Sequence, residues 1–319
     1  AYRRSDTATV EVDSVELRRL VLAGQNMHFE ELPCHKQDLT FRTLEEKLEA
    51  EHVVKALNED VLRTFNLFNF EAGFNNAALI VSDQNTFPGI DVARFGENIN
   101  TIADRATFEG ISVIEQIDGA CTMFERYYSV ETIEGARRTR HYSIPYEAFR
   151  EAVANAVAHR TWDVNAKIRI AMHPDRIEIS SPGGLPAGLG RDEYLKGFIS
   201  QLRNPILANV LFRLNIIEMF GTGIVRIRSS YAEYEQKPEF NVSENAVRVT
   251  LPVTDARPAL TSEEELVYQF VKEEGSTVSG QIVANFGFGK DKAVKLLRSL
   301  VEKRYVKKTG NGRGTRYRV

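Results

Sequence analysis

Several features that mark particular protein classes are scarce in this chain of 319 residues. It has only two cysteines, Cys34 and Cys121, which lie far apart and have no nearby cysteine or histidine partner. A disulfide framework or a zinc site is therefore not expected, and this cysteine usage favours a reducing cytoplasm. No apolar run approaches the roughly 20 residues that a helix needs to cross a bilayer, so we expect no membrane partner.

Recognisable processing and helicase signals are also missing. The chain begins AYRRSDTATVEVD, without a Met and without a secretory signal, so we expect it to be cut from a larger protein. A phosphate-binding G-x-x-x-x-G-K-[ST] motif is absent, because its nearest string, GFGKD (287–291), lacks the spacing and the Ser or Thr. What remains is an ordinary globular composition, 43% hydrophobic and 27% charged, with length for two or three domains.

Charge is distributed unevenly along the chain. From position 290 to the end there are eleven Lys or Arg against two acids, a net charge of +9. The whole chain carries −3, which leaves −12 for the rest. A basic module on an acidic body indicates a polyanionic partner at one end only.

Periodicity predicts a mixture of helices and strands. Residues 14–24 are predicted to form a helix that starts at Ser14, and one or two helices follow from Thr40. Residues 77–83 (AALIVSD) and 89–97 (GIDVARFGE) are predicted as short strands separated by a turn. Further predictions are a helix over 112–130, a hairpin of IRIAM and RIEIS around 173–176, a helical stretch ending near 220, and a strand over 246–253.

The segment REAVANAVAHRTW (150–162) combines an apolar stripe with a row of three polar residues, here called the polar file. Glu151, Asn155 and His159 are spaced four residues apart, so they lie above one another on one side of a helix. Ala152, Val153, Ala156 and Val157 form the neighbouring apolar stripe. The polar file therefore borders the buried face, where it either lines a cleft or forms a solvated helix edge.

Two glycine-containing segments follow this helix, SSPGGLP (180–186) and FGTGI (220–224). Glycine permits a turn with positive φ or a close approach of the backbone to a ligand. The second segment leads into a predicted helix, whose first N–H groups can hold a phosphate. An amide oxygen can ligate Mg²⁺ while a Glu four residues earlier orients or deprotonates water. Both glycine segments could equally be plain turns.

The strings EAFREAVANAVAHR, RIEISSPGGLP and RNPILANVLFRLNIIEMFGTGIVRI together resemble a known family. It is the RecG-like C-terminal domain of bacterial transcriptional regulators, a divergent member of the GHKL nucleotide-binding superfamily. The resemblance covers about residues 143–253 and implies ATP and Mg²⁺ as cofactors. It implies that Glu151 activates water, that Asn155 ligates Mg²⁺, and that RNPILAN (203–209) lies in the nucleotide lid. The implied nucleotide-binding residues are Asn155, His159, Ser181, Gly183, Gly184, Arg203, Asn204, Gly221, Thr222 and Gly223.

Departures from the family pattern bear on catalysis. The adenine-binding Asp of the superfamily aligns with Ser181, and Leu185 replaces the last glycine of that motif. A serine selects adenine less strictly than a carboxylate does, so these departures favour nucleotide binding over hydrolysis. Whether the protein is an enzyme stays open. His159 and Arg160 either cap the helix end or contact phosphate.

The N-terminal part, residues 1–142, resembles the distal half of Schlafen/AlbA-type regions, which precede the RecG-like domain in such regulators. The resemblance rests on YRRSDTATVEVDSVELRRL and on AALIVSD with GIDVARFGE. It implies an α/β region that is truncated at its N-terminus and associated with nucleic acid.

The last sixty residues resemble a winged helix-turn-helix. Three helices are predicted: the first has Ser262 as its N-cap, the second ends near Gly287, and the third buries Ala293, Val294, Leu296, Leu297, Leu300 and Val301. A basic hairpin over 305–319 follows. In this fold the third helix enters the major groove and the wing follows the backbone. The candidate DNA-binding residues are Lys290, Lys292, Lys295, Arg298, Lys307, Lys308, Arg313 and Arg316.

These observations predict an α+β, multidomain protein. Its parts are the Schlafen/AlbA-type region (1–142), a GHKL-like α/β sandwich (143–254), a linker (255–261) and a winged helix (262–319). The leading hypothesis is a DNA-binding transcriptional regulator, active as a homodimer, in which a nucleotide orders residues 185–223 and changes winged-helix spacing on double-stranded DNA. The alternatives are a DNA-stimulated ATPase with Glu151 as general base, and a degenerate domain that serves only as a dimerisation scaffold.

Overall fold

The computed structural model describes all residues except 1, 6–7, 135–136, 187, 198–200, 220, 255–259, 304, 311 and 313–314. The chain divides into two compact units. The first comprises Ala1–Ser230 and Pro238–Val253, and the C-terminal unit comprises Tyr231–Lys237 and Thr254–Val319. Within the described residues, no helix has the length and apolar character needed to span a membrane.

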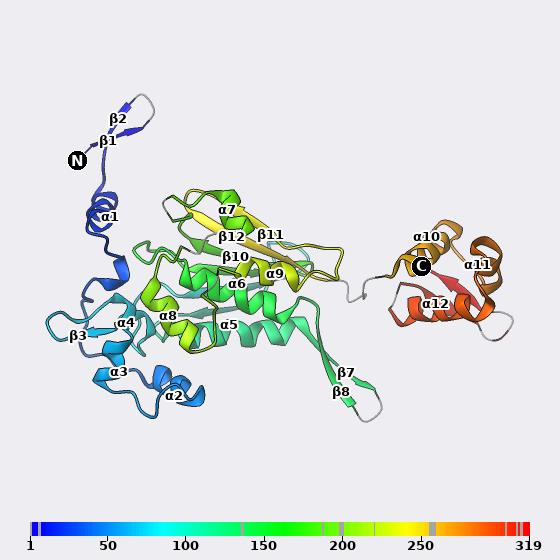
Figure 1. The fold of residues 1–319 in the computed structure, drawn as a ribbon, viewed down its shortest axis with the longest axis horizontal. Coiled ribbons are helices and arrows are strands. Elements are labelled where there is room, and N and C mark those ends of the chain that lie inside the picture. The colour runs from blue at the N-terminus through cyan, green and yellow to red at the C-terminus, as the bar shows by residue number, and fades with distance from the viewer. Residues whose placement is uncertain are drawn as a thin grey trace. The chain divides into compact units, whose positions relative to one another are not determined.

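A six-stranded mixed sheet forms the centre of the first unit (Figure 1). Its order is β11 (Glu239–Val242), β12 (Ala246–Pro252), β10 (Arg176–Pro182), β9 (Ile168–Met172), β5 (Ile90–Phe95) and β6 (Ile102–Phe108). The predicted hairpin is confirmed, because β9 and β10 pair antiparallel with Ile177 opposite Met172. Only β5 and β9 pair in parallel among the neighbouring strands described.

Two helices, α5 (Val113–Tyr128) and α6 (Tyr146–Ala158), pack against each other and against this sheet (Figure 1). Ser112 caps α5 through its hydroxyl, and Pro145 occupies the N-cap of α6. The rings of Phe124 and Phe149 stack between the two helices with centroids 4.3 Å apart. Between them in the chain lies a hairpin of β7 (Ser129–Glu134) and β8 (Arg137–Tyr142).

The N-terminal segment begins with a hairpin of β1 (Tyr2–Ser5) and β2 (Ala8–Glu11) and continues with α1 (Ser14–Gly24). The 3₁₀ helix η1 (Phe29–Glu31), α2 (Arg42–Ala50), α3 (Glu59–Thr64) and a short hairpin of β3 (Phe68–Asn69) and β4 (Gly73–Phe74) follow. The helix predicted over 14–24 is confirmed, and its N-cap is Asp13, whose carboxylate accepts the N–H groups of Val15 and Glu16.

The strand predicted over 77–83 is wrong, because this segment forms helix α4 (Asn76–Val81). All six residues of α4 are buried, so the segment has no polar face that would reveal a helical period. Its start is marked by Asn75, whose side chain accepts the N–H of Ala78.

Between β10 and β11 the described residues form helices α7 (Arg191–Lys196), α8 (Pro205–Arg213) and α9 (Gly223–Ser229). Leu207, Ala208, Val210 and Leu211 of α8 are fully buried. Helix α9 packs against α6 and brings the second glycine segment next to Asn155.

The C-terminal unit contains α10 (Ser262–Glu274), α11 (Ser279–Phe286), α12 (Lys290–Glu302) and a hairpin of β13 (Lys307–Thr309) and β14 (Arg316–Arg318). Thr261 rather than Ser262 caps α10, in a reciprocal arrangement with Glu264. The core of the unit includes Val267, Ile282 and Leu297. Val294 was predicted to be buried, and this prediction is wrong, because its side chain is 40% exposed.

Candidate functional site

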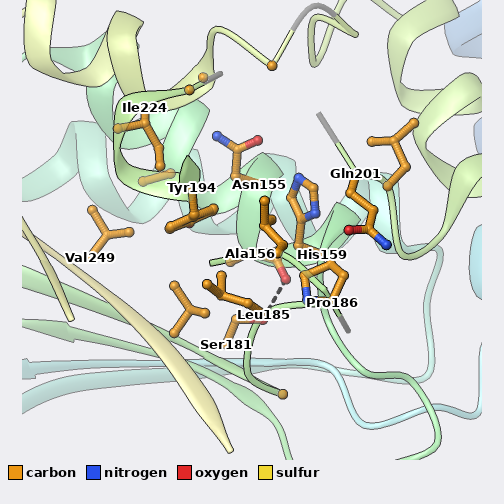
Figure 2. Close-up of a pocket in the computed structure, with 18 of the residues that line it drawn as sticks. Asn155, Ala156, His159, Ser181, Leu185, Pro186, Tyr194, Gln201, Ile224 and Val249 are labelled. Carbon is orange, nitrogen blue, oxygen red and sulfur yellow. Dashed lines mark hydrogen bonds between the residues drawn. The ribbon is translucent and has the colours of Figure 1, made fainter. Parts of the chain in front are cut away.

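A cavity of about 980 Å³, open to solvent, lies in the first unit between α6, the sheet and the segments that join β10 to α9. This volume includes the solvent-filled mouth of the cavity. A mostly apolar wall with a few polar groups is typical of small-molecule sites. Figure 2 shows Asn155 and His159 entering it from α6, Leu185 and Tyr194 from the β10–α8 connection, and Ile224 from α9. Its apolar wall includes Ala152, Ala156, Ile179, Leu185, Pro186, Leu189, Leu202, Ile217, Ile224, Val247 and Val249.

The polar file of α6 is divided between the cavity and the protein interior. Asn155 lines the cavity, whereas Glu151 does not and is only 4% exposed. The Asn155 Nδ2 donates a hydrogen bond of 3.1 Å to Oε1 of Glu151. Burial raises the pKa of Glu151, and the bond from Asn155 opposes this. Glu151 is therefore a buried carboxylate that is hydrogen-bonded to Asn155 and does not itself face the cavity.

Gly223 packs directly on this pair. A Cβ at Gly223 would lie 2.5 Å from Nδ2 of Asn155 and 2.6 Å from Oε1 of Glu151. Gly221 and Gly223 both line the cavity, and Gly221 has a φ of 70°. The second glycine segment is thus both a turn and a close backbone approach to the two side chains that the sequence singled out.

His159 is the third polar residue of the file, and it lines the cavity. Burial, with a smaller effect of the nearby Arg203 guanidinium, lowers the pKa of His159 to about 4. The imidazole is therefore neutral at physiological pH, so it presents a hydrogen-bonding group to the cavity but no charge.

The segment SSPGG forms the floor of the cavity and the turn that leaves β10. The Ser181 hydroxyl donates to the carbonyl of Ala156 over 2.7 Å, so it can only accept from a ligand. Gly183 has a φ of 102°, and a Cβ on Gly184 would lie 2.3 Å from the carbonyl oxygen of Glu244. Both glycines are needed by the turn itself, in addition to their place on the cavity wall.

Three residues implied by the resemblance do not line the cavity: Arg203, Asn204 and Thr222. Asn204 is buried, and its Nδ2 donates to the carbonyls of Ala158 and Arg160 over 2.8 Å each, so it fixes the end of α6. Arg203 donates to the carbonyl of Gly184 over 2.8 Å. Thr222 is the N-cap of α9, and its hydroxyl is buried without a hydrogen-bond partner among the described residues.

The resemblance also implies that 203–209 lies in a nucleotide lid, and the structure differs here. Most of this segment lies in α8, whose Leu207 and Ala208 are 0% exposed, so it is part of the core. The described parts of 185–202 form the outer wall instead, through Leu185, Leu189 and Tyr194. Burial raises the pKa of Tyr194 to about 12, so its phenol is neutral. These residues belong to the segment 185–223 that the leading hypothesis expects a nucleotide to order.

Neither interpretation of Arg160 holds, because its side chain turns inward. Its guanidinium donates to the carbonyls of Pro88 and Ala166 and lies 4.3 Å from the ring centroid of Trp162. Burial lowers its pKa to about 10, so it is still a cation at neutral pH. Arg160 joins two loops and neither caps the helix nor faces the cavity.

The described residues hold no group of three or more His, Cys, Asp or Glu that could bind a metal ion by itself. On the cavity wall the amide oxygen of Asn155 is the candidate ligand, and the carboxylate of Glu151 lies behind it, bonded to its Nδ2. Mg²⁺ commonly binds through one or two protein oxygens together with the phosphates of a ligand. These residues fit such a shared site and do not fit a dedicated metal centre.

The C-terminal unit presents the candidate basic residues on one helix and one hairpin. Lys290, Lys295 and Arg298 are exposed on α12, and Arg298 pairs with Glu302 over 2.9 Å. Lys292 pairs with Glu263 over 2.5 Å and lies over the ring of Phe288. On the hairpin, Lys307, Lys308 and Arg316 are exposed, whereas Tyr317 is buried. Arg313 lies outside the described residues.

Comparison with known proteins places one family in the middle of the chain. The family described as "putative ATP-dependent DNA helicase recG C-terminal" matches residues 165–251. This segment is similar to that family. The match begins before β9 and reaches β12, so it includes the first glycine segment and the second, but not α6 with Glu151 and Asn155.

A search of curated proteins finds no match. Among solved structures 38 chains match, including the DIP2311 protein of Corynebacterium diphtheriae, at 19% sequence identity and a TM-score of 0.62. The superposition covers 93% of this chain and 65% of that one. At this identity the likeness shows a shared fold alone, and this chain spans under two thirds of its neighbour's length.

Proposed function

We propose that the cavity binds a purine nucleotide and that the first unit contains a GHKL-type nucleotide-binding domain at 143–254. One observation carries the proposal: Asn155, Ser181 and both glycine segments, chosen from the sequence, come together on the wall of one cavity. The family match over 165–251 supports it independently, because that family is described as ATP-dependent. The apolar wall suits a planar base, and Asn155 marks the polar end.

Magnesium fits this proposal as a partner of the nucleotide. Asn155 supplies an amide oxygen, while its Nδ2 stays with Glu151. When bound, the ion neutralises phosphate charge. The residues of the chain then hold and orient: Asn155 positions the polar end of the ligand, and Gly223 keeps the pair of Asn155 and Glu151 in place.

Binding without rapid hydrolysis is the form of the proposal that the geometry favours. Glu151 is the candidate general base, but it is buried beneath Gly223 and does not border the cavity. A general base must come within hydrogen-bond distance of its water. We therefore expect little phosphate release. Steady-state release that disappears in Glu151→Gln would favour the alternative, a DNA-stimulated ATPase.

For the C-terminal unit we propose a winged helix-turn-helix that binds double-stranded DNA. Three helices followed by a two-stranded hairpin support this assignment, as do the exposed basic side chains on α12 and β13–β14. Such side chains contact phosphates and position a helix in the major groove. With residues 1–142 proposed as a Schlafen/AlbA-type region, the chain would act as a nucleotide-responsive transcriptional regulator and as a homodimer.

Calorimetric titration of Mg²⁺-ATP into the protein tests the nucleotide site. We expect saturable binding that weakens about tenfold or more in Asn155→Ala, since one charge-assisted contact contributes about 1.5–3 kcal/mol. Asn209→Ala, a change of the same residue type outside the cavity wall, is the matched control. Absence of heat at millimolar ATP would leave the third hypothesis, a scaffold that carries a DNA-binding module.

A further inference from the structure

The cavity has an electrostatic feature that its proposed ligand does not explain. Among the described residues that line it, the only side chain charged at neutral pH is Glu218, because His159 and Tyr194 are neutral. A phosphorylated ligand is an anion, and a carboxylate on the wall repels it. A protein cation close to Glu218 would offset this repulsion.

Arg226 on α9 is that cation. Its guanidinium lies 3.3 Å from Oε1 of Glu218, and both side chains are close to half exposed. Arg226 follows Gly223 by three residues on α9, and Gly223 packs on Glu151 and Asn155. An exposed ion pair of this kind contributes little stability, so its partners can exchange.

Arg150, the other arginine close to Glu151, is engaged differently. Its guanidinium donates to the carbonyl of Asn215 over 3.0 Å and lies near that of Ile216. These are backbone groups of the turn that follows α8, and they do not move independently of the fold. Arg150 therefore supports the cavity wall, whereas Arg226 is held by a side chain that can rotate away.

We propose that Arg226 is a phosphate-binding residue that exchanges its partner on ligand binding. Without ligand, Glu218 neutralises Arg226. With a phosphorylated ligand, the guanidinium turns to the phosphate, where a planar fork makes two parallel hydrogen bonds. Glu218 then acts as a competitor for the same cation, and the pair selects phosphorylated nucleotides over nucleosides. This inference rests on the proposed function and adds a specificity-determining pair to it.

The test compares ADP with adenosine as ligands of the full chain, in Mg²⁺ buffer at fixed ionic strength. For Arg226→Gln we expect the Kd for ADP to rise about tenfold, the value of one charge-assisted contact, with the Kd for adenosine unchanged. For Glu218→Gln we expect ADP to bind about twofold to fivefold more tightly, which matches the free energy of an exposed ion pair. In the double variant the gain from Glu218→Gln should largely disappear.

Arg213→Gln is the matched control, because Arg213 is exposed on α8 and does not line the cavity. The dependence of the ADP Kd on salt is a second readout, and it should be shallower in Arg226→Gln than in the control. An equal loss of ADP and adenosine binding in Arg226→Gln, or an unchanged ADP Kd, would overturn the inference and leave the nucleotide site standing. Failure of the unaltered protein to bind either ligand would instead overturn the proposed function, and the inference with it.

Discussion

At the scale of single residues, the contact of Gly223 with Asn155 and Glu151 decides how the polar end of the cavity is built. The two side chains are held together by one hydrogen bond and covered by a glycine Cα. Neither can move aside easily, because Glu151 is buried within α6 and Asn155 is packed beside it. The site is therefore sensitive to volume at a position that carries no functional group.

Gly223→Ala should weaken nucleotide binding and also lower the free energy of unfolding by about 1–3 kcal/mol, the range for overpacking a well-packed site. The added Cβ would meet Nδ2 of Asn155 at 2.5 Å, so the amide must leave its position. Urea denaturation and nucleotide titration of the variant check both effects. Gly24→Ala is the control, because a Cβ there meets nothing within 4 Å; an equal response of the two variants would contradict the packing argument.

The sequence identified the polar residues of α6 but could not show which of them line the cavity. Four-residue spacing placed Glu151, Asn155 and His159 on one side of α6, as the structure has them. It could not show that Asn155 and His159 reach the cavity while Glu151 turns into the interior. That difference depends on Gly223, some seventy residues later in the chain, and no local pattern carries it.

At the scale of elements, α8 is anchored by a residue that lies about 175 positions earlier in the sequence. Glu30 of η1 is fully buried, and its carboxylate accepts the N–H groups of Ile206 at 2.6 Å and Leu207 at 2.9 Å. Both N–H groups lie in the first turn of α8, where the helix itself provides no acceptor and where a negative charge is favourable. Asn204, just before them, holds the end of α6. Glu30 therefore supports the cavity through α8.

Glu30 should make stability depend on pH. Burial raises its pKa to about 7 in the folded protein, although the two backbone N–H groups oppose the shift. The folded state then binds more protons than the unfolded state between about pH 4.5 and 7, so this contribution is present below pH 4.5 and is lost as pH rises through 7. Its size is at most about 3 kcal/mol.

Urea denaturation of the unaltered protein and of Glu30→Gln, at several pH values from 4.5 to 8, measures this contribution. The stability difference between the two should shrink as pH rises, because only the unaltered protein carries the titrating group. His159 acts in the opposite sense, since its lowered pKa removes stability as pH falls from about 6.5 to 4, but it is present in both proteins. A difference independent of pH would contradict the buried carboxylate.

Within α12, the contacts divide the basic residues into two kinds. Lys292 is neutralised by Glu263 and lies over Phe288, whereas Lys295 is exposed and has no ion pair among the described residues. On the proposal that α12 contacts DNA, Lys295→Gln should reduce the slope of log affinity against log salt by about 0.9, the value for one lost phosphate contact. Lys292→Gln should change it less. Fluorescence anisotropy with a labelled duplex at several salt concentrations distinguishes them, and equal slopes would be evidence against the assignment.

Elements with a clear period were predictable, and α4 was not. The hairpin of β9 and β10, helix α6 and the three helices of the C-terminal unit follow from alternation or from helical spacing. Residues 77–81 are apolar without a period, since α4 is buried on every side. A short apolar run of this kind suits a buried strand or a buried helix equally well. Only the cap at Asn75 distinguishes the two.

At the scale of the whole molecule, the chain forms two compact units, and the proposed function requires that one influences the other. The unequal distribution of charge in the sequence agrees with this division, since the basic segment from 290 lies within the C-terminal unit. The sequence could not show how a ligand in the first unit would influence the second, because that coupling depends on two states of the molecule. The central claim is that nucleotide binding changes DNA binding.

The measurement that tests this claim most directly is the affinity for a DNA duplex with and without saturating Mg²⁺-ATP, at one salt concentration, for the unaltered protein and for Asn155→Ala. The account predicts a nucleotide-dependent change of about fivefold or more, within the usual range of allosteric coupling, and its loss in Asn155→Ala. Unchanged DNA affinity in a protein that demonstrably binds ATP would contradict the account, and so would an equal response of the variant.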